Sequence, residues 1–110
     1  MTKALEVAIR DEEGYLVEPD HWTEDVARRI AASEGLALTE EHWRIIGFMR
    51  ERYAERQVAP DARFVIKFMA DELGYGACAG ARLFELFPYG YVKQACKVAG
   101  MKRPRAWSTG

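Results

Sequence analysis

Cysteine and histidine are scarce in this chain, and long apolar runs are missing. The 110 residues include two cysteines and two histidines. A structural zinc site needs four converging ligands of these kinds, so the sequence predicts no metal, and no pattern in it calls for a cofactor. The chain also lacks a glycine-rich loop that follows a strand and carries the lysine used to bind phosphate. Metalloenzymes and nucleotide-binding enzymes of that kind are therefore disfavoured.

No stretch is apolar enough for a transmembrane span, and charges interrupt the first ten residues too early for a secretory signal. Two cysteines far apart in the chain, Cys78 and Cys96, do not make a disulfide framework. With 49% hydrophobic and 30% charged residues the chain is expected to fold, without membrane association. We expect a cytoplasmic protein.

Charge is distributed unevenly along the chain, although the formal net charge is only −1. Residues 1–85 carry 11 basic and 17 acidic side chains, whereas residues 86–110 carry five basic and no acidic ones. The basic residues near the end are Lys93, Lys97, Lys102, Arg103 and Arg105. Such a segment suits an acidic protein surface, a nucleic acid or an anionic substrate, and charge alone does not choose among them.

The fold class predicted is mainly α, a compact bundle of about five helices with a small N-terminal β-hairpin. Alternating apolar residues at 5, 7 and 9, acidic turn residues at 11–14 and apolar residues at 15–17 predict the hairpin. Residues 1–100 are expected to form a single domain. Residues 101–110 show no periodicity and are expected to form a flexible C-terminal arm.

Helix boundaries are indicated by caps and breakers. Thr23 is a predicted N-cap, and Gly35 is expected to end that helix. A longer helix is expected to start after Thr39 and to run to about residue 56, with Pro60 breaking the chain before the third helix. The fourth helix is predicted over about 79–86, and the fifth carries Cys96.

Cys96 is the main candidate for chemistry. A thiol reacts as its thiolate, and cations such as Lys93 and Lys97 favour that form, so Cys96 is a candidate for nucleophilic or sulfur-carrying work. The other interpretation is structural. Val92, Ala95, Cys96 and Ala99 have the spacing of a buried helical stripe, in which cysteine is a small apolar filler. Both interpretations stay open at this point.

Other candidates have a stronger structural explanation. Cys78 precedes a helix, where backbone N–H groups favour a thiolate, but a small residue in a tight joint is the preferred explanation. His42 lies on the inward stripe of the long helix and is predicted to be a packed, hydrogen-bonded histidine rather than a general base. Nucleic-acid binding through a helix-turn-helix and the basic arm is an alternative with less weight, because no helix of the body has a basic face.

Three blocks of sequence resemble the DsrC/TusE family of sulfur-relay proteins. They are residues 11–16, residues 38–46 and the specific block from Phe87-Pro88-Tyr89-Gly90 to Lys93-Gln94-Ala95-Cys96-Lys97. The resemblance covers most of the chain. It implies a small cytoplasmic protein, mainly helical, with an N-terminal hairpin and a mobile C-terminal arm. Members carry persulfide sulfur between sulfurtransferases in tRNA 2-thiouridine synthesis, or act as partner and substrate of dissimilatory sulfite reductase.

The chain departs from this family at its end. The family's sulfur-carrying residue is typically a penultimate cysteine, and the position where it would fall is occupied by Trp107. One hypothesis is therefore a sulfurtransferase-type carrier that uses Cys96 with help from Lys93 and Lys97. The other is a paralogue without transfer activity, a regulatory adaptor or DNA-binding protein. In that hypothesis the arm residues Lys102, Arg103, Arg105 and Trp107 bind the partner.

Overall fold

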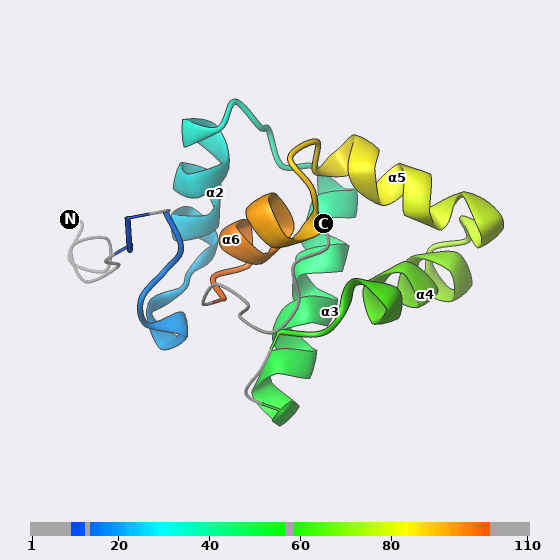
Figure 1. Ribbon diagram of the computed structural model, residues 1–110, viewed down its shortest axis with the longest axis horizontal. Helices are drawn as coiled ribbons and strands as arrows, with labels where there is room; N and C mark the ends of the chain where they lie inside the picture. The colour runs from blue at the N-terminus through cyan, green and yellow to red at the C-terminus, as the bar shows by residue number, and fades with distance from the viewer. Residues whose placement is uncertain (1–9, 13, 57–58, 102–110) are drawn as a thin grey trace.

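The computed structural model describes residues 10–12, 14–56 and 59–101, and in them the chain is helical (Figure 1). The elements are η1 (Pro19–His21), α2 (Glu24–Ser33), α3 (Glu40–Arg56), α4 (Ala62–Glu72), η2 (Gly76–Cys78), α5 (Ala79–Leu86), the π-helix η3 (Tyr91–Ala95) and α6 (Cys96–Val98). The mainly helical prediction is confirmed, and α5 has the predicted bounds. None of the helices in this part of the chain is long and apolar enough to cross a membrane.

The segment formed by η3 and α6 lies in the middle of the molecule (Figure 1). Its helix α6 packs against α2. Elsewhere in the molecule, α4 packs against both α3 and α5. Tyr91, Ala95, Cys96, Val98 and Ala99 are all at most 1% exposed. A helix that is buried nearly all round belongs to the core, so the predicted fifth helix is the centre of the fold.

Local sequence signals explain where α2 begins and ends. The Thr23 side chain accepts a hydrogen bond of 3.1 Å from the backbone N–H of Val26, which makes it the predicted N-cap. Beyond the helix, Gly35 has a φ of +74°, and the N–H of Leu36 donates to the carbonyl of Ala31. A glycine in the left-handed conformation ends helices in this way, because other residues are strained there.

The predicted β-hairpin is not found. Its first strand lies outside the described residues, and the described part holds a tight turn closed by one isolated antiparallel bridge between Arg10 and Leu16. Tyr15 and Leu16 are 3% and 1% exposed, so two successive side chains are buried where a half-exposed strand would bury every second one. Pro19 follows closely and has no N–H to extend a ladder.

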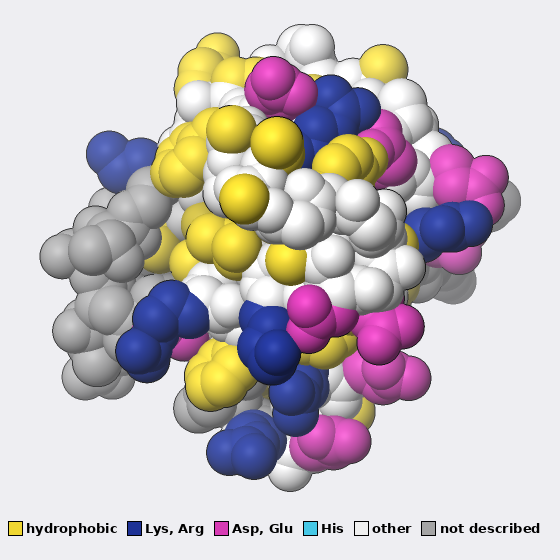
Figure 2. Space-filling model, turned by 90° about the vertical axis from the view of Figure 1, so that its right-hand side faces the viewer, with side chains coloured by type: hydrophobic (Ala, Val, Ile, Leu, Met, Phe, Trp, Pro, Cys, Tyr) yellow, Lys and Arg dark blue, Asp and Glu magenta, His cyan; other side chains and the backbone are white. Residues whose placement is uncertain are grey.

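The side of the molecule on which α4 and α5 lie exposes hydrophobic side chains. Figure 2 shows hydrophobic side chains gathered over the middle and upper part of this face, with charged side chains of both signs around them. Two phenylalanines contribute to the exposed apolar surface of these helices, Phe64 on α4 and Phe84 on α5, which are 49% and 51% exposed.

Candidate functional site

The π-helix η3 determines how the candidate cysteine is presented. Gly90 has a φ of +97°, and its carbonyl accepts hydrogen bonds from the N–H groups of Gln94, at 3.0 Å, and Ala95, at 3.2 Å. The N–H of Cys96 donates to the carbonyl of Tyr91 in the same wide pattern. π-Helical turns are rare and often occur at functional sites, so this segment is the first place to look for chemistry.

Cys96 begins α6 and has no exposed surface. Burial raises the pKa of its thiol to about 12, and a hydrogen bond with the Tyr91 hydroxyl opposes this rise only in part. The phenol of Tyr91 donates its proton in a short hydrogen bond to the carbonyl of Pro60, and burial raises the pKa of Tyr91. In the folded protein the thiol is therefore neutral and packed, as the filler interpretation predicts.

Lys97 has a different partner from the one the sequence suggested. Its Nζ lies 2.8 Å from Oε2 of Glu34 and 5.4 Å from the centre of the Tyr15 ring. Lys93 is exposed. The predicted support of a Cys96 thiolate by these two lysines has no counterpart among the described contacts, and a sulfur-carrying role for Cys96 stays a prediction.

Gln94 completes this arrangement from inside the core. It is 1% exposed, its Nε2 donates to Oε1 of Glu34 at 3.0 Å, and its Oε1 accepts from the N–H of Tyr89 at 3.0 Å. Glu34 is the C-terminal cap residue of α2, so both of its oxygens connect that helix to the central segment. The polar residues on either side of Cys96 thus hold η3 and α6 in place, a role that sequence reasoning missed.

The end of the central segment is held by a second cluster. Trp22 Nε1 donates to the carbonyl of Val98 at 2.9 Å, and Arg50 Nη1 donates to the carbonyl of Ala99 at 2.7 Å. The guanidinium of Arg50 lies 4.3 Å from the centre of the Trp22 ring, and burial lowers its pKa. Next comes Gly100, and then Met101, which has no exposed surface. The predicted arm residues Lys102, Arg103, Arg105 and Trp107 lie outside the described residues.

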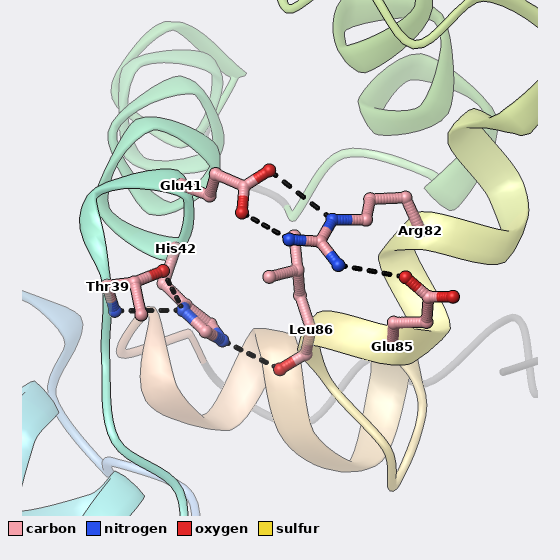
Figure 3. A network of polar contacts seen from close by, with 6 residues as sticks. All are labelled: Thr39, Glu41, His42, Arg82, Glu85 and Leu86. Carbon is pink, nitrogen blue, oxygen red and sulfur yellow. Dashed lines mark hydrogen bonds and ion pairs between the residues drawn. The ribbon is translucent and has the colours of Figure 1, made fainter.

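His42 is packed and hydrogen-bonded, as predicted (Figure 3). Its Nδ1 lies 2.9 Å from the backbone N of Thr39, a group that only donates, and its Nε2 lies 2.7 Å from the carbonyl oxygen of Leu86. Nδ1 must therefore accept, and Nε2 must carry the proton. The imidazole joins the start of α3 to the end of α5, with both ring nitrogens engaged in hydrogen bonds.

An ion-pair network lies beside this histidine. Arg82 on α5 makes a short contact with Glu41 on α3 and donates to Glu85 at 2.8 Å (Figure 3). These groups are partly exposed, so the network contributes modestly to stability and mainly fixes how α3 and α5 lie together.

The chain is similar to proteins of known function. Residues 3–106 match the family model described as "DsrC like protein". The chain is 44% identical over 94 residues to the sulfurtransferase TusE of Salmonella paratyphi A, covering 86% of each chain, and 42% identical to that of Escherichia coli K12 with the same coverage. The chain belongs to the DsrC-like family.

Solved structures of DsrC proteins agree with this assignment. The fold matches the oxidized γ-subunit of the dissimilatory sulfite reductase (DsrC) from Archaeoglobus fulgidus with a TM-score of 0.84, at 33% identity and covering 92% of each chain. It matches DsrC of Allochromatium vinosum with a TM-score of 0.79, at 44% identity, covering 90% of this chain and 88% of that one.

This DsrC-like chain is accordingly a sulfur-relay protein of the DsrC/TusE type, as the resemblance implied. A regulatory or DNA-binding role finds no support in these relatives, whereas the other part of that alternative, the absence of sulfur transfer by this chain, is not tested by them. What the family membership does not specify is which group of this chain takes part in sulfur transfer, because Cys96 is buried here.

Proposed function

We propose that this protein helps sulfur pass within a relay by binding the relay's proteins, while Cys96 remains a core residue and the reacting sulfur stays on the partner. The partners proposed are sulfurtransferases of the relay or the catalytic subunits of a dissimilatory sulfite reductase. The observation that carries the proposal is the complete burial of Cys96 in a fold that this chain shares with DsrC.

Thiol chemistry supports the proposal that the reacting sulfur stays on the partner and not on Cys96. Sulfur exchange requires a thiolate that can approach the sulfur it attacks. Burial raises the pKa of Cys96 to about 12, so the protonated thiol is favoured at pH 7, and no surface of it is open to a partner. Both properties oppose sulfur exchange at Cys96 in the folded chain and support the proposal that the reacting sulfur stays on the partner.

The contacts around Cys96 support the same conclusion. Glu34, Gln94 and Lys97 fix the polar side of the segment, and Trp22 and Arg50 fix its end. Exposing the thiol would break these contacts and remove several side chains from the core. Such an opening resembles global unfolding more than the movement of a loop.

The test is an intact-mass measurement combined with binding. Wild type, Cys96→Ala and Cys78→Ser are each incubated with a persulfide-loaded, cysteine-dependent sulfurtransferase, and complex formation is measured by calorimetry. We expect all three to bind with the same affinity and none to gain a sulfur atom.

Two results would overturn the proposal. A gain of one sulfur atom in wild type that is lost in either cysteine variant would make this chain a carrier at that cysteine. Failure of wild type to bind would remove the binding role. Thermal unfolding of Cys96→Ala would verify that the variant is folded at the assay temperature.

A further inference from the structure

A pocket of about 180 Å³ lies where the end of α3 meets the start of α4. It is lined by Arg52, Arg56, Ala59, Pro60, Asp61 and Phe64. We propose that this pocket is a protein-docking site that receives a carboxylate side chain from an acidic segment of the relay partner. The identity of the partner rests on the function proposed above, whereas the pocket and its chemistry do not.

Arg52 is held in place for such a contact. Its guanidinium lies 5.3 Å from the centre of the Phe48 ring and 5.9 Å from the centre of the Phe64 ring. Phe48 is itself stacked on Phe68, with ring centres 4.3 Å apart. A guanidinium that is already oriented by aromatic rings loses little freedom on binding a carboxylate, and its planar shape suits a bidentate contact.

The positive charges around the pocket are not fully balanced by acidic side chains. Arg52 and Arg56 are one helical turn apart, and Arg52 reaches Glu55 only at 3.9 Å in an exposed ion pair. Arg56 has no ion pair among the described residues. Like charges one turn apart are unfavourable in an isolated helix, so an added carboxylate would stabilise this end of α3.

Asp61 is the acidic residue of the pocket lining, and its carboxylate already accepts hydrogen bonds from Arg63. Its Oδ1 accepts from the backbone N–H of Arg63 at 3.0 Å as the N-cap of α4, and its Oδ2 lies 3.4 Å from Nη2 of Arg63. These contacts hold its pKa below the usual value and balance its charge locally. The charge of Arg56 is therefore not neutralised by Asp61.

Size and composition favour a side chain over a cofactor. Ligand pockets usually enclose about 300–1,000 Å³, so this one suits one or two side chains. Its floor is fixed, because Pro60 is buried and its carbonyl accepts the hydrogen bond from Tyr91. Phe64 at the rim is 49% exposed. Arginine and aromatic residues around a small preformed pocket are typical of the centre of a protein interface.

The experiment measures the affinity for the same sulfurtransferase by calorimetry at low and at physiological salt. The double variant Arg52→Glu and Arg56→Glu reverses the charge of the pocket, and Phe64→Ser removes its aromatic rim. The matched control is Arg44→Glu, which reverses an exposed arginine of the same helix that pairs with Glu40 at 3.7 Å.

We expect the double variant to bind at least tenfold more weakly, Phe64→Ser several-fold more weakly, and the control within twofold of wild type. Added salt should weaken wild type more than the double variant. If wild type binds and the double variant binds equally well, the docking site is wrong and the proposed function stands. If wild type does not bind at all, both proposals fall.

Discussion

Glu34 and Lys97 are 63 residues apart in the sequence and joined by an ion pair of 2.8 Å between Oε2 and Nζ. Their side chains are only 14% and 16% exposed. Because Glu34 ends α2 and Lys97 belongs to α6, the pair connects the first long helix to the central segment. Lys97 is thereby part of the structure around Cys96, and its support of a thiolate there stays a prediction.

Removing one member of this pair should destabilise the protein. In Glu34→Ala the ammonium of Lys97 and the amide of Gln94 lose their partner in a largely buried position, so we expect a loss of about 2–3 kcal/mol in the free energy of unfolding. Urea denaturation measures it. The control is Asp71→Ala, which removes the exposed partner of Lys67 and should change stability by less than about 0.5 kcal/mol. Equal effects of both substitutions would contradict the structural role of Glu34.

Local signals in the sequence predicted most of the helices. The cap at Thr23, the break at Pro60 and the bounds of α5 depend on neighbouring residues, and each is where the pattern indicated. The hairpin prediction failed at residues 15–17. A short apolar run after an acidic turn resembles the second strand of a hairpin, but Tyr15 and Leu16 are both buried in the core by long-range packing, which local spacing does not encode.

The candidate site was predictable only in part. The apolar stripe through Ala95, Cys96 and Ala99 predicted burial, and burial is what the structure has. Lys97 was assigned to the thiol because it is adjacent in sequence, yet neighbouring residues on a helix point in different directions. Its pairing with Glu34 is a long-range contact, and the π-helical turn has no periodicity of its own to reveal it.

The two cysteines should differ sharply in reactivity. Cys78 is exposed and Cys96 is buried, so a maleimide in excess should label one thiol per folded chain, at Cys78. Cys96 should become reactive only as urea unfolds the protein, with the same denaturant dependence as global unfolding. Mass spectrometry of wild type and Cys78→Ser measures both rates. Rapid labelling of Cys78→Ser without urea would show a local opening at Cys96.

Cys96 should also make stability depend on alkaline pH. Its pKa is raised from an unfolded value of 9.0 to about 12, so its contribution is fully present below pH 9 and is lost as pH rises toward 12. Over that interval the free energy of unfolding should fall as pH rises, because the unfolded chain releases this proton and the folded one does not. The buried Tyr91, whose pKa is also raised, adds to the loss.

Cys96→Ala removes the thiol's share of this effect together with the part of the Tyr91 pKa shift that Cys96 causes. The variant retains Tyr91 but has no thiol to ionise, so its stability should fall less steeply than that of wild type between pH 9 and pH 11. Urea denaturation at half-unit steps of pH gives both curves. Parallel curves would mean that the thiol ionises as easily in the folded protein as in the unfolded one, in conflict with its burial.

Gly100 should tolerate a side chain poorly. Its φ is +80°, and a Cβ would lie 2.2 Å from Cδ1 of Trp22 and 2.9 Å from Nη1 of Arg50. Gly35 has a similar φ of +74° with no atom within 4 Å of the same position, so Gly35→Ala reports backbone strain alone. We expect Gly35→Ala to lose about 1–2 kcal/mol and Gly100→Ala clearly more, at about 3 kcal/mol or above, in urea denaturation.

The difference arises because the methyl group must displace Trp22 and weaken its hydrogen bond to Val98, which holds the end of the central segment just before the predicted arm. Equal losses would mean that Trp22 and Arg50 move aside freely, and the segment's end would then not be fixed by them.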